Sequence, residues 1–326
     1  MIHRMDEPAP GWVPLPDLVP AMLATPSSTL PADEAGWTYE MKWDGVRVTG
    51  YAEGGRIRLM SRNDKDVTAT YPELRQLGAA LGSTQVVLDG EVVAFDDDGR
   101  PSFGRVQQRL GVTSPSSTRR LASTTPVVYI LFDLLHLDGA STVALPYWRR
   151  RELLEGLELT GPAWLTPPTL DGDGADLLQA TRDQGLEGLI AKRNESVYRP
   201  GRRSPDWLKI KNLLDLEVVI GGWTSGAGRR QETLGALLLG VPERAGLRYV
   251  GKVGTGFTDS MLRDLERRLT GLDATTSPFL DVPRKDAKEA HWCAPSLVGE
   301  VVHSGLTAEG RLRHPSWRGL RLDKSG

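Results

Sequence analysis

A lysine near the start of the chain has the sequence context of a covalent nucleophile. Lys42 lies in residues 39–45, which read YEMKWDG, and more lysines, arginines and carboxylates follow in an order suited to one nucleotide site. An amine attacks phosphorus only after losing its proton, and nearby positive charge or burial lowers a lysine pKa from about 10.4. Lys192, Lys209 and Lys211 are candidate sources of that charge. These residues indicate nucleotidyl transfer through a lysine.

The same segment also fits a simple turn. The Asp44-Gly45 pair is flanked by two alternating runs, residues 37–43 and 46–51, which is a signal for a two-residue β-hairpin. In that interpretation Lys42 is a solvated strand residue. Taken alone, so short a pattern is more often a turn than an active site, so the neighbouring motifs must decide.

Two carboxylates are candidate metal ligands. Glu91 follows Asp89-Gly90, and Glu187 precedes an apolar run. Magnesium bound to a nucleotide takes one or two protein carboxylates and keeps several waters. Residues 207–211 alternate, which places Lys209 and Lys211 on one face, where a triphosphate would relieve their repulsion. Each feature alone also fits a surface glutamate or an exposed sheet face.

The bulk composition is that of a globular protein. The chain has 326 residues, 39% of them hydrophobic and 25% charged, which suits two domains. No apolar run approaches the roughly 18 residues of a membrane helix, so we expect no membrane association and a cytoplasmic location. The single Cys293 excludes an internal disulfide framework, and five scattered histidines do not fit a zinc finger. A metal would therefore be held by oxygen.

The formal charge of −2 shows that the protein is not basic as a whole, so a phosphate-binding surface must come from local clusters of basic residues. Two clusters have tryptophans among their cations, which suits a nucleic-acid surface, although charge runs are usually solvated faces. Their members are Arg199, Arg202, Arg203, Lys209 and Lys211 with Trp207, and Arg311, Arg313, Arg318, Arg321 and Lys324 with Trp317.

The hydrophobic pattern predicts two domains. Residues 1–213 read as an extended arm (1–35) followed by an α+β domain on antiparallel sheets. Two hairpins are expected over residues 37–62, the second of them turning at residues 53–55, and a further hairpin over 85–95 turns at Asp89-Gly90. Strands are expected over 127–135, 188–192 and 207–211, and helices over 72–81, 147–157 and 175–184. In residues 214–326, short apolar strands surround one helix, 259–272, which predicts a five-stranded OB-fold β-barrel.

Together these motifs resemble the covalent nucleotidyltransferases, most closely the ATP-dependent DNA ligases of the bacterial non-homologous end-joining type. Residues 42–45 are similar to the nucleotide-attachment motif, with Arg47 five residues after the lysine. The other similar segments are 61–63, 88–91, 131–135, 187–192, 207–211 and 311–324. Each is short, but their order and intervals together are specific. The resemblance runs from about Pro20 to the C-terminus.

The resemblance implies that Lys42 attacks the α-phosphate of ATP, that AMP passes to the 5′-phosphate of a nick, and that the 3′-hydroxyl then seals the strand. It also implies a role for each matching residue. Glu40 would lie beside the adenine amino group, Phe132 would stack on the base, Arg47 and Glu91 would lie near the ribose, and Lys192 would bind the nucleotide. Glu187 and Glu91 would hold Mg²⁺, with Mn²⁺ as the other candidate, and Lys209 and Lys211 would offset charge on the α-phosphate. Arg62 would meet the 5′-phosphate, and Arg313, Arg321 and Lys324 would orient pyrophosphate after the second domain closes about a hinge at 213–216.

The resemblance also sets expectations for partners. ATP is favoured as the donor because the cysteines of the zinc module in NAD-dependent ligases are missing. No helical DNA-encircling domain precedes residue 20, so help from another protein is expected. The implied partners are nicked or broken duplex DNA, the end-binding protein Ku, and separate polymerase or nuclease proteins.

Two other functions remain open from sequence. An RNA ligase or a GMP-loading capping enzyme would use the same lysine chemistry. A non-catalytic nucleic-acid-binding protein with an OB module is a rival from another class, although all the catalytic side chains named above are present.

Overall fold

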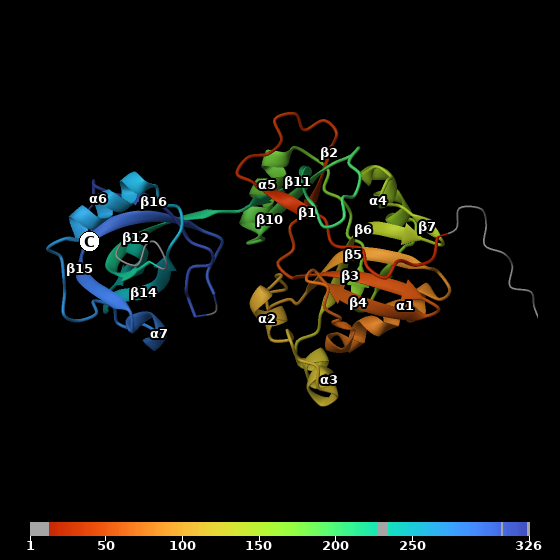
Figure 1. Ribbon diagram of the computed structural model, residues 1–326, viewed down its shortest axis with the longest axis horizontal. Helices are drawn as coiled ribbons and strands as arrows, with labels where there is room; N and C mark the ends of the chain where they lie inside the picture. The colour runs from red at the N-terminus through yellow and green to blue at the C-terminus, as the bar shows by residue number, and fades with distance from the viewer. Residues whose placement is uncertain (1–12, 227–233, 308, 325–326) are drawn as a thin grey trace, which may run out of the picture. The chain divides into compact units, whose positions relative to one another are not determined.

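The computed structural model describes residues 13–226, 234–307 and 309–324. The chain divides into two compact units, Met1–Asn212 and Leu213–Gly326 (Figure 1). In the described ranges no helix is both long and apolar enough to span a membrane.

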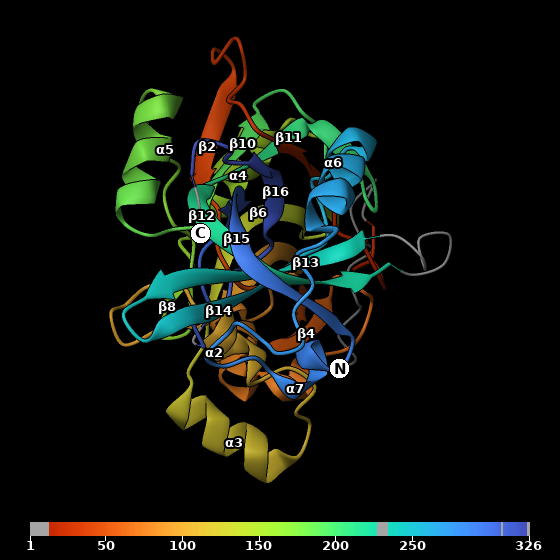
Figure 2. The ribbon, with the colours of Figure 1, turned by 90° about the vertical axis from the view of Figure 1, so that its left-hand side faces the viewer.

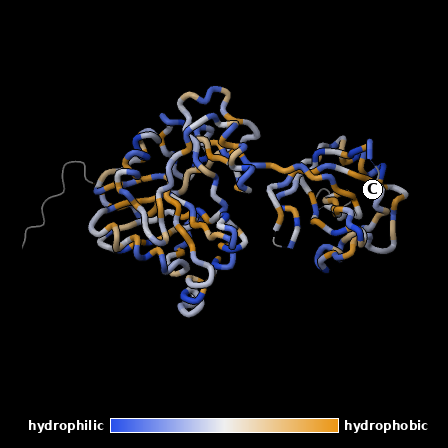
Figure 3. The backbone as a smooth tube through the Cα atoms, turned by 180° about the vertical axis from the view of Figure 1, so that it is seen from behind, coloured by the Kyte–Doolittle hydropathy of each residue, from blue (hydrophilic) through white to orange (hydrophobic). Residues whose placement is uncertain are grey.

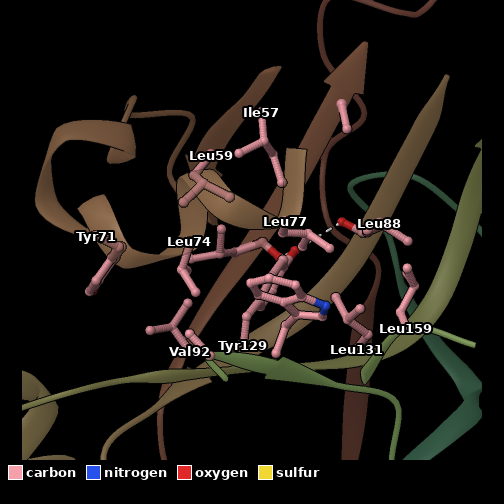
Figure 4. Packing of buried hydrophobic residues seen from close by; sticks show 14 of the residues in the cluster. Ile57, Leu59, Tyr71, Leu74, Leu77, Leu88, Val92, Tyr129, Leu131 and Leu159 are labelled. Atoms are coloured by element: carbon pink, nitrogen blue, oxygen red, sulfur yellow. Dashed lines mark hydrogen bonds between the residues drawn. The ribbon is translucent and has the colours of Figure 1, made fainter. Parts of the chain in front are cut away.

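The larger sheet of the first unit forms around a hydrophobic core. Its strands run in the order β4 (Arg56–Ser61), β3 (Val46–Glu53), β5 (Val86–Val93), β6 (Val128–Leu137), β9 (Trp164–Leu165) and β8 (Thr160–Gly161), with β7 (Ala140–Ser141) paired to β6. All neighbours are antiparallel except β6 and β9. Figure 4 shows Leu59, Leu88, Tyr129 and Leu131 from these strands packing with Leu74 and Leu77, which come from η2 (Pro72–Leu74) and α1 (Arg75–Leu81). Burial of these apolar side chains drives the sheet and helix together.

A smaller sheet of the first unit carries the lysine motifs. Its order is β1 (Leu23–Ser27), β11 (Arg203–Lys211), β10 (Gly188–Arg193) and β2 (Trp37–Met41). The helix α5 (Gly174–Asp183) contributes Leu177 and Leu178 to the apolar cluster under this sheet. β1, from the N-terminal arm, lies parallel to β11, so part of the expected arm is a strand. Residues 1–12 of that arm lie outside the described residues.

The Asp44-Gly45 pair does not turn a hairpin, so that alternative for Lys42 is wrong. β2 pairs with β10 in the smaller sheet, whereas β3 pairs with β4 and β5 in the larger one. Gly45 is needed for close approach, because a Cβ there would lie 2.4 Å from the Val92 carbonyl oxygen. The chain therefore leaves one sheet at Lys42 and enters the next.

The predicted hairpin over residues 85–95 is also wrong. β5 continues through Asp89-Gly90, and both halves pair with β3 and β6. A Cβ at Gly90 would lie 2.4 Å from the Ile130 carbonyl oxygen and 2.5 Å from the Tyr129 ring, so this glycine also serves close packing. The hairpin at residues 53–55 is confirmed, since Glu53 pairs with Arg56.

Most other expected elements of the first unit are confirmed within a few residues. The helix expected over 147–157 is α4 (Tyr147–Glu155), and the strand expected over 127–135 is β6. The sequence pattern had assigned nothing to residues 96–126. The structure places α2 (Phe103–Gln107) and α3 (Pro115–Thr124) there.

The second unit is the expected five-stranded β-barrel of the OB type. Its strands run in the order β14 (Gly246–Val253), β13 (Leu234–Glu243), β12 (Leu214–Ser225), β15 (Ala290–His303) and β16 (Ser316–Leu320), with α6 (Asp259–Leu269) and α7 (Arg284–Ala287) outside the sheet (Figure 2). The two edges meet through hydrogen bonds from the Leu312 amide to Val250 (2.7 Å) and from the Trp317 amide to Thr255 (2.9 Å). Apolar residues concentrate along the strands of each unit (Figure 3).

Candidate active site

Lys42 and Glu187 are brought together where β2 and β10 pair. The Lys42 amide donates to the Gly188 carbonyl oxygen at 2.9 Å, which fixes the backbone of both motifs. Gly188 has φ +131°, and a Cβ there would lie 2.1 Å from the Ile210 carbonyl oxygen, so β10 and β11 approach closely only with glycine at this position. Sequence motifs about 145 residues apart thus share one backbone scaffold.

One carboxylate bridges two of the candidate lysines. Lys42 Nζ lies 2.5 Å from Glu187 Oε2, and Lys211 Nζ lies 2.8 Å from Glu187 Oε1. Burial opposes ionisation of Glu187, but the two ammonium groups outweigh it and hold the Glu187 pKa below its usual value. Glu187 is therefore an ionised carboxylate with both oxygens occupied by cations.

Two further groups feel the field of this cluster. Burial, and then the charges of Lys211 and Lys42, lower the pKa of Lys209. Burial raises the pKa of Glu91 to about 7, although Arg47 and Lys42 oppose the shift. Carboxylates and ammonium groups with displaced pKa values are typical of functional sites.

Beside this cluster, Glu40 anchors a buried polar network. Lys192 Nζ lies 2.8 Å from Glu40, the Tyr147 hydroxyl donates to Glu40, and Arg151 Nη1 lies 3.7 Å away. The Lys192 ammonium also lies 4.4 to 4.8 Å from the ring centres of three aromatic side chains, those of Phe132, Tyr147 and Trp207. Burial lowers the Lys192 pKa, and Glu40 opposes that shift. Glu40 is thus held in one orientation by two hydrogen-bond donors, Lys192 and Tyr147, and by the charge of Arg151.

Arg47 is held beside the expected base-stacking residue. Its guanidinium forms two hydrogen bonds with Asp89, at 2.5 and 2.6 Å, and its carbon lies 4.4 Å from the centre of the Phe132 ring. The Tyr198 hydroxyl donates to the same carboxylate at 2.6 Å. Buried Asp89 therefore fixes Arg47, and Arg47 packs on Phe132.

In the second unit, another carboxylate holds two cations. Arg321 Nη1 and Lys324 Nζ each lie 2.6 Å from Glu217, and Arg321 also contacts Asp323 and Glu300 at 2.9 and 3.4 Å. Arg313 donates its amide to Gly305 at 2.9 Å. The three expected pyrophosphate-binding residues thus belong to the second unit.

The predicted site residues other than Arg313, Arg321 and Lys324 lie in the first unit. Among them, Arg62 is exposed and makes no ion pair within the described part of the chain. Sequence reasoning missed Tyr147, Arg151 and the structural role of Asp89. Tyr147 and Arg151 lie four residues apart on α4, a spacing that places both on one helix face, but nothing in the sequence showed that this face meets Glu40.

The donor set fits a nucleotide-borne divalent cation better than a protein-only metal site. Within the described residues, no group of three or more His, Cys, Asp or Glu side chains could hold a metal. Glu187 and Glu91 interact electrostatically, and each raises the other's cost of ionisation, a cost that a divalent cation would remove. Two carboxylates plus phosphate oxygens and water satisfy magnesium.

The Lys42 amine lies beside a carboxylate and further ammonium groups, next to buried aromatic and acidic side chains, in a chain that also forms an OB barrel. These features define a covalent nucleotidyltransferase. Two family models match the chain. The ATP dependent DNA ligase domain covers residues 21–211, and the ATP dependent DNA ligase C terminal region covers residues 230–324. The chain belongs to the family of ATP-dependent DNA ligases.

Curated relatives agree with this assignment. The multifunctional non-homologous end joining protein LigD of Mycolicibacterium smegmatis is 43% identical over the whole chain, and the protein of that name from Pseudomonas aeruginosa is 37% identical over 96% of it. The chain spans 41% and 36% of the lengths of these two relatives.

A solved structure is similar along most of the chain. The ligase domain of LigD from M. tuberculosis is 42% identical, with a TM-score of 0.56, and the match covers 94% of this chain and 96% of that one. A mycobacterial DNA ligase D complexed with ATP and MES matches equally well. The site described above thus belongs to a family that uses ATP.

Proposed function

We propose that this chain seals nicks or ends in duplex DNA by forming a covalent AMP adduct on Lys42. The observation that carries the proposal is the pair of ion pairs that Glu187 makes with Lys42 and Lys211. They place the Lys42 amine in a cluster where an anion already lies between two ammonium groups. Nucleophilic catalysis through a lysine requires the neutral amine, and the ammonium groups of Lys209 and Lys211 supply positive charge for phosphates in the same cluster.

The reaction proceeds in three balanced steps. The neutral Lys42 amine attacks the α-phosphorus of ATP, so that the phosphorus–nitrogen bond forms, the bond to pyrophosphate breaks, and the amine gives up a proton. An oxygen of a DNA 5′-phosphate then displaces the lysine, which is protonated as it leaves. Finally the adjoining 3′-hydroxyl attacks that phosphate, closes the strand and releases AMP.

The residues around Lys42 divide the work. Lys209 and Lys211 stabilise charge that develops on the α-phosphate, an effect that removal of comparable donors puts at about 3 to 4 kcal/mol. Arg313, Arg321 and Lys324 are proposed to orient the departing pyrophosphate, and Arg62 to bind the 5′-phosphate of the nick.

Glu40 supports adenine as the base. Its carboxylate is held by Lys192 and Tyr147, so it presents an acceptor that suits the adenine amino group and repels the oxygen at that position of guanine. We propose that Phe132 stacks on the base, with Lys192 beside it, and that Arg47 and Glu91 contact the ribose. ATP is then preferred over GTP.

Glu187 and Glu91 are the residues proposed to hold Mg²⁺, with Mn²⁺ as the other candidate. When bound, the ion neutralises phosphate charge and polarises the α-phosphate. Glu187 would exchange its lysine contacts for the metal, and ionisation of Glu91 would become favourable.

The biological setting is also a proposal. Relatives named for multifunctional non-homologous end joining support duplex DNA ends as the substrate. We propose that the chain works in the cytoplasm with an end-binding Ku protein and with polymerase and nuclease activities on other polypeptides.

The decisive experiment is labelling with single nucleotides followed by sealing. Purified protein is incubated with ATP or GTP, and intact-mass spectrometry measures an added nucleotide that acid removes. We expect AMP on Lys42 from ATP, and sealing of nicked duplex DNA. Equal labelling from GTP, or sealing of RNA in place of DNA, would favour the alternative of a capping enzyme or an RNA ligase. Labelling of a Lys42→Ala variant would refute the proposal.

A further inference from the structure

One part of the first unit has an unusual charge pattern. The longest interval of the chain without an acidic residue runs from Gly99 to Phe132, although the formal charge of the whole chain is −2. This interval includes α2 and α3 and contains five arginines, Arg100, Arg105, Arg109, Arg119 and Arg120, and no lysine. The active site described above does not account for this local positive charge.

One of these arginines is structural and holds α3 in place. The Arg109 side chain is fully buried and lies 2.7 and 3.0 Å from the two carboxylate oxygens of Glu73. It also donates to the carbonyl oxygens of Thr70 and Thr125, each at 2.8 Å, so it joins the end of α3 to the 70–73 segment. A buried ion pair with these extra hydrogen bonds makes α3 a fixed projection of the fold.

The outer face of α3 carries arginines beside hydroxyl groups. Thr118 is buried, whereas residues at the helical spacing of the opposite face are exposed. The exposed members are Ser116, Arg119, Arg120, Ser123 and Thr124. Arg119 donates from Nε to the Pro115 carbonyl oxygen at 3.1 Å, and neither Arg119 nor Arg120 makes an ion pair with any residue that the structure describes. Figures 1 and 2 show α3 standing at the edge of the first unit.

The segment begins at the active site. The Phe103 amide, at the start of α2, donates to Asp44 at 3.4 Å, and Asp44 lies two residues after Lys42. By contrast, α5 of the same unit has Asp173 at its N-cap, Asp176 in its first turn and Asp183 at its end. A polyanion that enters the Lys42 site would therefore be attracted by α3 and repelled by α5.

We propose that the exposed face of α3 is a docking surface for the sugar–phosphate backbone of duplex DNA, bound by Arg119 and Arg120. Guanidinium groups bind phosphate through paired N–H donors, whereas the Ser123 and Thr124 hydroxyls donate to the Arg119 and Arg120 carbonyl oxygens. Contacts of this kind position a duplex without reading its sequence, which suits an enzyme that acts at any break. The inference rests on the proposed DNA-sealing function and assigns part of the DNA grip to residues outside the catalytic pocket.

The test compares two pairs of exposed helical arginines in the same unit. The test variant is R119A/R120A, and the matched control is R149A/R182A, on α4 and α5. Fluorescence anisotropy measures binding of a nicked duplex with a 5′-phosphate and a dideoxy 3′ end, which cannot be sealed, over a series of salt concentrations. We expect the slope of log affinity against log salt to fall in magnitude by about 1.8 in the test variant, about 0.9 for each lost phosphate contact. The control variant should match wild type.

Three readouts make the outcomes separable. Self-adenylylation, which needs no DNA, should stay at the wild-type level in R119A/R120A, whereas the KM for nicked DNA rises. If R119A/R120A unfolds, the R119Q/R120Q variant carries the same test. Wild-type DNA affinity and a wild-type salt slope in a folded variant would overturn the docking surface. Polyglutamate serves as a probe for an acidic protein partner. A variant that loses polyglutamate binding but keeps DNA binding would also overturn the proposal, because α3 would then bind an acidic protein and not DNA. Failure of wild type to form AMP adducts or to seal DNA would instead refute the proposed function.

Discussion

Two carboxylates in this molecule each form ion pairs with two cations, but they differ in how far they are exposed to water. Glu187 in the first unit binds Lys42 and Lys211 with 13% of its side chain exposed, and Glu217 in the second unit binds Arg321 and Lys324 with 41% exposed. Water and salt screen an exposed pair, whereas a partly buried pair is screened much less. The ion pairs of Glu187 are therefore stronger, and those of Glu217 are weaker and more easily exchanged for another anion.

Removal of the nucleophile should give the largest effect. Lys42→Ala should reduce self-adenylylation by at least about 10⁴-fold, the order found for loss of a covalent nucleophile, because no other amine in the site has the same backbone placement. Intact-mass spectrometry after incubation with ATP measures the adduct. Lys65→Ala, which removes an exposed lysine of the same unit, is the control and should label as wild type does. An AMP adduct on another lysine of the cluster would show that the Glu187 site does not select its nucleophile.

Removal of the bridge should cost less but still be severe. Glu187→Gln leaves Lys42 and Lys211 without their shared anion, and we expect self-adenylylation to fall about 100-fold, the upper range for residues that support a metal or nucleophile. Single-turnover labelling with ATP at several magnesium concentrations measures the change. Asp183→Asn, at the exposed end of α5, should have no effect. A Glu187→Gln rate within a few-fold of wild type would mean that burial does not distinguish the two carboxylates.

The pH dependence of stability should report the burial of Glu91. Burial raises its folded-state pKa from 4.5 to about 7. The folded protein therefore holds a proton that the unfolded chain has lost, so wild-type stability falls as pH rises from about 4.5 to 7 and then levels. Glu91→Gln lacks this loss, and its free energy of unfolding relative to wild type should rise over that window by on the order of 2 kcal/mol.

Urea unfolding at pH 5 and pH 8 measures this difference. Glu152→Gln, an exposed glutamate on α4, should show no such pH-dependent change. A Glu91→Gln effect that is the same at both pH values would show that Glu91 titrates as an ordinary surface carboxylate, and the first unit would then have no desolvated acid beside Lys42.

Loss of the second carboxylate should give the smallest effect, and in the opposite direction. In the proposed role of Arg321 and Lys324, Glu217 would compete with pyrophosphate for these two cations, so Glu217→Gln should lower the KM for ATP in self-adenylylation by about two- to fivefold at low salt. The gain should disappear at high salt, because exposed pairs are screened. Steady-state labelling at two ionic strengths measures it, with Glu243→Gln as the control that breaks another exposed pair of the same unit. A large loss of activity would mean that Glu217 positions the two cations and does not compete for them.

The sequence predicted the chemistry of the site better than its architecture. Lys42, Glu187, Lys209 and Lys211 were grouped from residue type and order, and the structure brings them together. From sequence, the pairs Asp44-Gly45 and Asp89-Gly90 predict turns, because the local signal for a turn is strong. In each case a glycine is required because another strand passes too closely for a Cβ, and such an approach depends on residues far away in the chain.

The residues that hold the site were the hardest to predict. Tyr147 and Arg151 were expected only to form a helix, and Asp89 only to precede a turn, yet they orient Glu40 and Arg47. Their partners lie about 40 to 110 residues away in sequence. Short-range periodicity carries no information about contacts of that length.

The sequence alone indicated nucleotidyl transfer through a lysine, because a lysine, several carboxylates and a set of basic residues at these intervals have few chemical uses in common, but it left the nucleic acid open. It also determined the two-part pattern of strands and helices, since hydrophobic periodicity is a local property. Only the tertiary structure decided which glycines allow strands to touch, which carboxylate is buried between two cations and which is more exposed to water, and which helix presents unpaired arginines within the described residues. Burial and proximity arise from the whole fold, and they set the strength of every charge in it.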